Sequence, residues 1–581
     1  MIRRLSQCVR EYKRASILTP LFVSFEVVME VLIPYYMGKL LDLGVTVGDM
    51  GYILKSGGLL VVFCVLSLTF GVLSGKNAAT ASAGFARNVR HDMFYNVQAF
   101  SFSNIDRFSV SSLVTRLTTD VTNLQNAYQM IIRIAVRSPM MLIFSLVMAF
   151  RVNHRLSLIF LCVLPLLAAG LAFIVSHAHP IFERVFKTYD VLNRVVSENL
   201  HGIRVVKAFV REQHETEKFN TVSEKIYKDF VSAEKLLALN APLMQFSSYA
   251  TTLLISWFGA HLIVASGNVP GEGMTTGDLV ILISYAMQIL STLMMLSMIF
   301  VMLTLSKASA QRIYEVLDET SDLHNPAQPV TDVKDGSVTF DHVSFSYAGD
   351  KDKLCLKDAS LKIESGQTVG VLGATGAGKS TLVQLIPRLY DATEGTVSVG
   401  GVDVRDYDLD TLRSKVAMVL QKNVLFSGTI KENLRWGNEG ATDEEIEEAC
   451  RLAQADEFIR TFPDGYDTHI EQGGSNVSGG QKQRLCIARS LLQKPKILIL
   501  DDSTSAVDTK TDALIRRAFR QSIPDTTKIV IAQRVSSVEH ADQIIVLDDG
   551  RIDAVGTHET LLATNKIYRE VYESQTKGGV Q

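Results

Sequence analysis

The sequence predicts a membrane bundle of six transmembrane helices, followed by a cytosolic α/β domain of the P-loop type. Long apolar runs fill the chain before about residue 305. After about residue 335, apolar stretches shorten to strand length and alternate with helical, charged segments, as in a domain built on a largely parallel sheet. In that second half, "GATGAGKST" stands between an apolar strand and a helical stretch, which is the setting of a P-loop.

Six segments of the first half are long and apolar enough to cross a bilayer, which takes ~20 residues. They lie near residues 17–43, 53–75, 129–151, 155–177, 243–267 and 276–303. The first is too long for a cleavable signal peptide and follows the basic stretch "MIRRLSQCVREYKRAS". The sequence therefore predicts a multi-pass protein of the cytoplasmic membrane.

The connections between these spans alternate in length. The links over about 77–128 and 178–242 are long, rich in Arg and Lys and apolar at helical spacing, whereas the other links are short. Positive charge favours the cytosolic side, so both long links should be cytosolic helices that project beyond the bilayer.

A polar segment with two prolines, residues 320–335, makes the natural boundary between the two halves. We expect a transmembrane domain over 1–319, with two long cytosolic loops, a linker over 320–335 and a soluble domain over 336–581. The strands expected in the soluble domain are "TVGVLG", "KVAMVL", "KILILD", "KIVIAQ" and "QIIVLDDG".

Charge and cysteine content exclude two classes of function. A net charge of -3 without a basic patch gives no reason to expect nucleic acid as a partner. The six cysteines are widely spaced and form no CxxC pair, so neither a disulfide framework nor a zinc site is indicated. Membrane lipids are the expected surroundings of the first half.

The P-loop supplies the first part of a nucleotide site. Its backbone N–H groups would close around phosphates, the Lys379 ammonium would reach the β- and γ-phosphates, and the Ser380 hydroxyl would ligate Mg²⁺. The candidate residues are Gly373, Thr375, Gly376, Gly378, Lys379, Ser380 and Thr381. A chance loop of the same composition is the alternative, and the flanking strand and helix argue against it.

The strand "KILILDD" supplies a second part, because Asp501 at its end can hold the magnesium ion. The next position should carry the group that orients the attacking water. Asp502 is one methylene shorter than glutamate, and a misplacement of ~1 Å can slow a reaction ~100-fold. We therefore expect slow hydrolysis at this site.

A third part is "VSGGQKQR", at the start of an expected helix. Ser478 and two glycines expose N–H groups at the positive helix end, which suits the γ-phosphate of a second nucleotide. A purely structural helix cap is equally compatible with this segment.

Together these motifs resemble those of ABC exporter half-transporters of the multidrug and lipid-export type, in family order and over essentially the whole chain. The resemblance implies ATP and Mg²⁺ as cofactors and ATP-driven export as the activity. It also implies two cytosolic loops, "NIDRFSVSSLVTRLTTDV" and "SENLHGIRVVKAFVREQHETEKF", whose short coupling helices touch the nucleotide-binding domains, although both could be only solvated helical surface.

The resemblance also assigns residue roles. Tyr347 would stack on adenine, Gln421 would join Ser380 and Asp501 at the magnesium ion, and Asp508 would end the D-loop "STSAVD". The signature that contacts the nucleotide of a second chain would consist of Ser478, Gly479, Gly480 and Gln481.

Two positions depart from the family pattern: Asp502 stands where glutamate is usual and Gln533 where histidine is usual. The chain thus resembles the degenerate-site subunit of a bacterial heterodimeric multidrug exporter. In the family, each ATP lies between the P-loop of one chain and the signature of the other. The implied partner is a homologous half-transporter with both residues intact, whose site this chain would complete.

The expected function is therefore ATP-driven export of a small hydrophobic or amphipathic, drug-like or lipid-like compound. A slow homodimeric lipid flippase, a peptide exporter and an ATP-gated channel or regulator on the same scaffold stay open as alternatives.

Two features of the spans are candidates for contact with cargo. Glu30 and Arg137 fall at the same depth, as do Glu26 and Arg133, so the pairs can meet; snorkelling of Arg133 and Glu26 to the inner interface is the alternative. The sixth span carries methionines mostly along one side, a soft surface typical of promiscuous binders, although lipid-facing or core packing fits as well. These are Met287, Met294, Met295, Met298 and Met302.

Overall fold

The computed structural model describes residues 1–269, 273–503 and 506–577, apart from the side chains of residues 186, 300, 301, 305 and 577. The chain forms two compact units. The first comprises Met1–Gln98 and Val110–Glu319, and the second comprises Ala99–Ser109 and Thr320–Gln581.

The first unit is entirely helical over its described residues. Its α-helices are α1 (Ile2–Gln7), α2 (Lys13–Leu40), α3 (Met50–Gln98), α5 (Val110–Thr115), α6 (Val121–Val152), α7 (His154–His201), α8 (Ile203–Ala208), α9 (Glu212–Leu237), α10 (Asn240–Ser266) and α11 (Thr276–Asp318). Over the described residues, six helical stretches are long and apolar enough to span a membrane, which confirms the six predicted spans.

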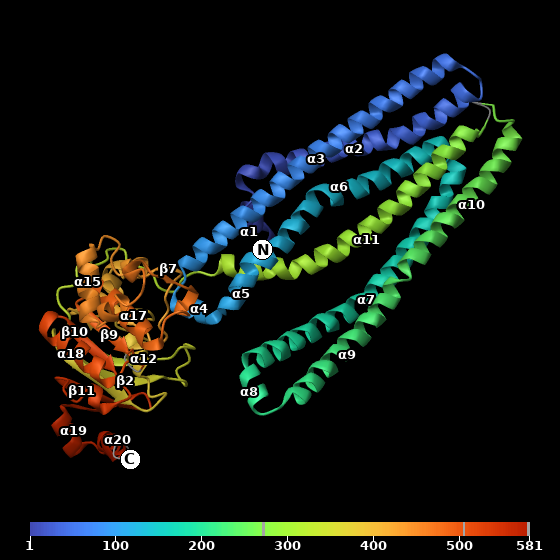
Figure 1. The fold of residues 1–581 in the computed structure, drawn as a ribbon. Coiled ribbons are helices and arrows are strands. Elements are labelled where there is room, and N and C mark those ends of the chain that lie inside the picture. The colour runs from blue at the N-terminus through green and yellow to red at the C-terminus, as the bar shows by residue number, and fades with distance from the viewer. Residues whose placement is uncertain (270–272, 504–505, 578–581) are drawn as a thin grey trace. The chain divides into compact units, whose positions relative to one another are not determined.

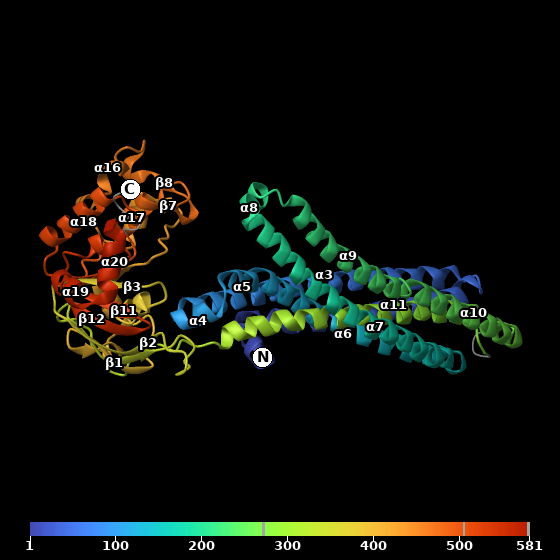
Figure 2. The same cartoon turned by 90° about the horizontal axis from the view of Figure 1, so that it is seen from below.

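Within this unit, α2, α3, α6 and α11 pack against one another. Helices α7, α9 and α10 form a long hairpin with α8 at its tip (Figures 1 and 2). Because α3 has 49 residues at ~1.5 Å each, it is more than twice as long as a ~30 Å hydrocarbon core. The spans therefore continue as helices beyond the bilayer, as the sequence predicts.

The second unit is an α/β domain. Its helices are α4 (Phe102–Arg107), α12 (Lys379–Gln384), α13 (Leu409–Lys415), α14 (Ile430–Arg435), α15 (Asp443–Leu452), α16 (Asp456–Ile459), α17 (Gly479–Leu492), α18 (Thr509–Ser522), α19 (His558–Thr564) and α20 (Lys566–Lys577). Its strands are β1 (Val338–Phe345), β2 (Leu356–Ile363), β3 (Thr368–Gly373), β4 (Glu394–Val399), β5 (Val402–Asp403), β6 (Val416–Val419), β7 (Gly428–Thr429), β8 (His469–Ile470), β9 (Ile497–Asp501), β10 (Thr527–Ile531), β11 (Gln543–Asp548) and β12 (Arg551–Gly556).

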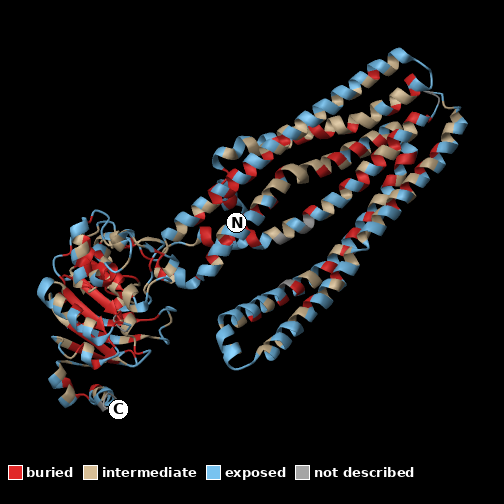
Figure 3. Cartoon of the chain, viewed as in Figure 1, coloured by how far each residue is buried: buried red, intermediate tan, exposed pale blue. Residues whose placement is uncertain are grey.

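The main sheet of this unit has the order β12-β11-β3-β10-β9-β6. Strands β11, β3, β10, β9 and β6 run parallel, and these are the five strands that the sequence predicts. Their residues are buried on both faces, so the strands lie in the core (Figure 3). A separate sheet, β2-β1-β4-β5, is antiparallel.

Candidate nucleotide-binding site

The P-loop joins the end of β3 to the start of α12, at the carboxyl edge of the parallel sheet. This edge is where α/β sheets place their ligands. A Cβ on Gly373 would lie 2.3 Å from the Leu547 carbonyl oxygen, and Gly378 has φ +91° with a carbonyl oxygen 2.7 Å from its ideal Cβ position. Both positions therefore require glycine. Thr375 and Gly376 form the exposed turn between them.

The Lys379 ammonium donates to the carbonyl oxygens of Gly373 and Ala374, at 2.9 and 2.8 Å. Burial lowers the pKa of Lys379, whereas the carboxylates of Asp501 and Asp502 oppose that shift. The ammonium thus lies inside the loop whose N–H groups would face phosphate.

The Ser380 hydroxyl donates to Asp501 Oδ1 at 3.1 Å, which places two hard oxygen donors together beside the P-loop. Burial raises the pKa of Asp501, and the bond from Ser380 opposes the shift. Oxygen donors of this kind are the ligands that Mg²⁺ prefers, usually completed by water and phosphate. A magnesium ion there would neutralise phosphate charge, and Ser380 and Asp501 would hold it.

Asp502 is held by Gln533, the residue at the position where the family usually has the switch histidine. Its Oδ2 accepts from Gln533 Nε2 at 2.8 Å, and Gln421 also hydrogen-bonds to this carboxylate. Burial raises the pKa of Asp502, and both bonds lower it in part. Gln421 thus lies against Asp502, the candidate catalytic position, so three of the predicted residues meet there.

Tyr347 lies beside the P-loop helix. Its hydroxyl hydrogen-bonds to Thr381 Oγ1 at 3.1 Å and donates to Gln384 Oε1 at 3.0 Å. Its ring meets Tyr390 edge to face, with centroids 5.1 Å apart. With about half of its surface exposed, the ring is available to stack on a base.

The signature segment caps α17. Ser478 Oγ accepts from Gln481 N at 3.3 Å, and the Gln481 side chain accepts from Ser478 N at 2.9 Å, which forms a capping box. A Cβ on Gly480 would lie 2.8 Å from the Ala506 carbonyl oxygen, and Gly479 also faces Ala506. The signature is therefore packed closely against the D-loop.

The D-loop ends at Asp508, whose carboxylate accepts from Thr511 N at 2.9 Å and caps α18. Residues 504 and 505 of the predicted D-loop lie outside the described residues.

Comparison with known proteins places this geometry in a family. Residues 17–294 match the model of the ABC transporter transmembrane region, and residues 356–505 match that of the ABC transporter domain. The chain is 38% identical over 550 residues to the ABC transporter ATP-binding protein YfiB of Bacillus subtilis, covering 95% of this chain and 94% of that protein. The chain belongs to the ABC transporter family.

Two further similarities cover most of the chain. The chain is 35% identical over 483 residues to the fatty acid ABC transporter ATP-binding/permease protein of Mycobacterium bovis, covering 83% of this chain and 75% of that protein. It also matches the structure of a bacterial Atm1-family ABC exporter with ATP bound, with a TM-score of 0.82, 25% identity and coverage of 97% and 99% of the two chains. This ABC exporter is thus a transport ATPase with fused transmembrane and nucleotide-binding domains.

In the spans of this ABC exporter, the predicted pairing of Glu30 with Arg137 is confirmed. Arg137 Nη2 lies 2.7 Å from both Glu30 carboxylate oxygens and 4.0 Å from Glu26 Oε1. Glu26 is buried, and its Oε2 has no hydrogen-bond partner among the described residues. Arg137 therefore lies near both carboxylates, whereas Arg133 interacts with Glu26 only electrostatically and forms no ion pair with it among the described residues.

Four of the five predicted methionines, all except Met287, line a cavity of about 520 Å³ in the first unit. The other lining residues are Leu171, Ile174, Val175, Leu237, Asn240, Ser291 and Ser297. The Asn240 Oδ1 atom is buried without a hydrogen-bond partner among the described residues. The cavity wall is otherwise apolar, apart from the two serine hydroxyls.

Tyr390, which is not among the residues predicted from the sequence, connects Tyr347 to α4 within the second unit. Its hydroxyl donates to Asp106 Oδ2 at 2.6 Å, and its ring packs against Phe102 with centroids 6.0 Å apart. The signal was present as an aromatic in "PRLYD", at the end of the stretch that follows the P-loop. An aromatic residue there is also compatible with simple core packing, so the sequence alone did not single it out.

Proposed function

We propose that this chain is the degenerate-site subunit of a heterodimeric exporter that moves a hydrophobic or amphipathic, lipid-like compound at the expense of ATP. The observation that carries the proposal is the bond from the Gln533 amide to the Asp502 carboxylate. A carboxylate that already accepts from two amides, and that is one methylene short, is poorly placed to orient a water molecule.

The parts that bind nucleotide support the other half of the proposal. Lys379, Ser380 and Asp501 lie together, so MgATP would still bind. The signature carries Val477 where the family usually has leucine and otherwise matches the family pattern, and Ser478 caps its helix. The chain would therefore complete a competent site on a partner that carries the glutamate and histidine.

The methionine-lined cavity supports the substrate class. Met298 lies 22 residues, or ~33 Å, from the start of α11, which corresponds to the cytoplasmic edge of a hydrocarbon core ~30 Å thick. A wall rich in methionine and free of charge suits an acyl chain or another flexible apolar body. The similarity to a fatty acid ABC transporter points to the same class.

A repair experiment tests the proposal. The purified full chain and its D502E/Q533H variant are reconstituted in liposomes, and steady-state ATP hydrolysis is measured. We expect the D502E/Q533H variant to hydrolyse ATP at least ~10-fold faster. The glutamate is long enough to reach the attacking water, and the histidine places an imidazole near the γ-phosphate. Native turnover equal to that of the repaired chain would contradict the degenerate site and favour an ordinary homodimer.

A second measurement separates a pump from a channel. A fluorescent fatty acid is loaded on one side of the vesicles, and its accumulation against a gradient is followed after MgATP is added to the repaired chain. Net accumulation supports export. Equilibration without accumulation would instead indicate an ATP-gated pathway.

A further inference from the structure

The switch segment of the nucleotide site, residues 533–538, is held from the side of the C-terminal helix. Gln575 on α20 donates from Nε2 to the Gln533 carbonyl oxygen at 2.8 Å and accepts at Oε1 from Val535 N at 2.8 Å. One side-chain amide thus makes two bonds to main-chain groups two residues apart. Such a paired contact fixes both the position and the direction of the segment.

Helix α20, which carries Gln575, is itself packed against the rest of the domain, so the position of Gln575 is fixed. Tyr568 is 1% exposed, its hydroxyl hydrogen-bonds to His558 Nδ1 at 2.7 Å, and its N–H donates to Asn565 at 2.8 Å. Tyr572 also packs against the core. Tyr568, Tyr572 and Gln575 are spaced i, i+4 and i+7, so they share one helical face.

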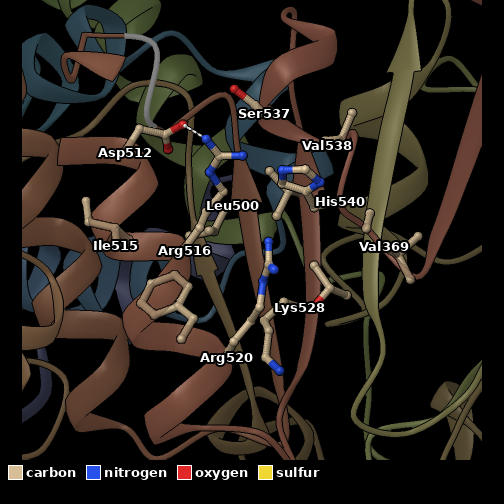
Figure 4. A pocket seen from close by; sticks show the side chains of 14 residues that line it. Val369, Leu500, Asp512, Ile515, Arg516, Arg520, Lys528, Ser537, Val538 and His540 are labelled. Atoms are coloured by element: carbon tan, nitrogen blue, oxygen red, sulfur yellow. Dashed lines mark ion pairs between the residues drawn. The ribbon is translucent and has the colours of Figure 1, made fainter. Parts of the chain in front are cut away.

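The switch segment has a second support from α18, the helix that begins at the end of the D-loop. Arg516 donates from Nη1 to the Ser536 carbonyl oxygen at 2.8 Å and pairs with Asp512 at 3.1 Å. Asp512 and Arg516 border a cavity of about 30 Å³ that Ser537 and Val538 also line (Figure 4). A water molecule needs ~10–15 Å³, so this cavity has room for solvent but not for a nucleotide.

We infer that Gln575 is a positioning residue for hydrolysis: it orients the switch segment so that residue 533 contacts residue 502. The chain of contacts runs from Tyr568 and α20 through Gln575 to the Gln533 backbone, and from the Gln533 side chain to Asp502. Gln575 touches neither carboxylate nor nucleotide position itself. Its effect should therefore appear in turnover and not in affinity for ATP.

The first test uses hydrogen exchange on the native full chain. Gln575→Ala should raise amide exchange over residues 533–537 about tenfold, because the Val535 N–H loses its acceptor. Thr576→Ala is the matched control: it removes a side-chain bond on the same helix, from Thr576 Oγ1 to the Tyr572 carbonyl oxygen, without touching the switch. Unchanged exchange in Gln575→Ala, or equal changes in both variants, would overturn the inference.

The second test uses turnover in the D502E/Q533H background, where position 533 keeps the same main-chain bonds. Gln575→Ala should lower kcat about fivefold to tenfold, leave the KM for ATP within about twofold and leave Tm unchanged. A fall in ATP affinity and Tm together would indicate a merely structural role and contradict the inference.

A third arm keeps the inference separate from the proposed function. In the D502E/Q533H background, replacing residue 533 by alanine and Gln575→Ala should be non-additive in their effect on ATP turnover, because both act through the contact between residues 533 and 502. If repair fails to raise turnover, the degenerate-site proposal falls, while the exchange result still decides the role of Gln575. Additive losses would mean that Gln575 acts by another route.

Discussion

At the scale of single residues, two carboxylates of the same chain end in unlike surroundings. Asp502 lies in the soluble domain with two amide donors, so its negative charge has neutral hydrogen-bond partners. Glu30 lies in a span, where only a cation can offset the cost of a charge. The two sites therefore respond differently to substitution: one changes chemistry, and the other changes folding.

The Glu30–Arg137 pair gives a direct prediction. Glu30→Gln or Arg137→Met alone should destabilise the chain by about 1–3 kcal/mol, less than the ~3–5 kcal/mol of a fully buried pair, because both side chains are a quarter to a third exposed. The double replacement should cost less than either change alone, since no charge is stranded. Thermal unfolding of the detergent-purified chain measures each value.

Replacing Glu224 and Lys228, an exposed i,i+4 pair on α9, is the control and should change stability by less than about 0.5 kcal/mol. If the two single losses at Glu30 and Arg137 simply add in the double variant, the residues have independent roles and the coupling is refuted.

Sequence and structure agree on these residues for a physical reason. Depth along a straight helix can be calculated from the number of residues. The equal distances of Glu30 and Arg137 from the outer ends of their helices therefore predicted that the two side chains could meet. Contacts between residues that are far apart in the sequence cannot be calculated in that way. Tyr390 lies 284 residues from Asp106, and Gln575 lies 42 residues from Gln533, so no local period marks these contacts.

At the scale of secondary-structure elements, local sequence patterns again predicted some features and missed others. The five parallel strands have uniform apolar runs and were predicted, whereas the antiparallel strands β1, β2, β4 and β5 have mixed patterns with register shifts and were not. Helix α4 likewise belongs to a loop of the membrane half in sequence but to the second unit in contact. Strands buried on both faces have a strong hydrophobic pattern in the sequence, whereas half-exposed elements have a weak one.

Helix α4 is the element that Tyr390 ties to the adenine side of the nucleotide site, and Tyr390→Phe tests that connection. The variant keeps the ring contacts with Tyr347 and Phe102 and loses one bond to the exposed Asp106, worth about 0.5–1 kcal/mol. Burial and the neighbouring Asp106 raise the pKa of Tyr390, so this hydroxyl stays a donor at neutral pH.

We expect unchanged binding of a fluorescent ATP analogue but a smaller change in hydrogen exchange over residues 99–109 when MgATP is added. Tyr407→Phe is the control, because it loses a hydroxyl bond to the Val399 carbonyl oxygen elsewhere in the same unit. An ATP-dependent exchange change of native size in Tyr390→Phe would show that the hydroxyl carries no coupling.

At the scale of the whole molecule, the proposed function divides the catalytic parts between two chains. In the proposed heterodimer, Asp502 serves the nucleotide on this chain's own P-loop, whereas the α17 signature serves the nucleotide of the partner. The capping box that fixes Ser478 is intact, while the Asp502 carboxylate is held by amides. The assembly should therefore depend more on this chain's signature than on its own carboxylate.

Three heterodimers with a half-transporter that bears the intact glutamate and histidine test this asymmetry: native, Asp502→Ala and Ser478→Arg. Asp502→Ala should keep most of the steady-state ATP hydrolysis, because the weak site contributes little turnover. Ser478→Arg should remove most of it, at least about tenfold, because a bulky cation replaces the cap that presents N–H groups to the partner's γ-phosphate. ATP binding at the weak site should survive in both variants, since Lys379, Ser380 and Asp501 are untouched. Equal losses in the two variants would mean that both sites turn over, and the assembly would then be a symmetric exporter in which Asp502 is an adequate substitute for glutamate.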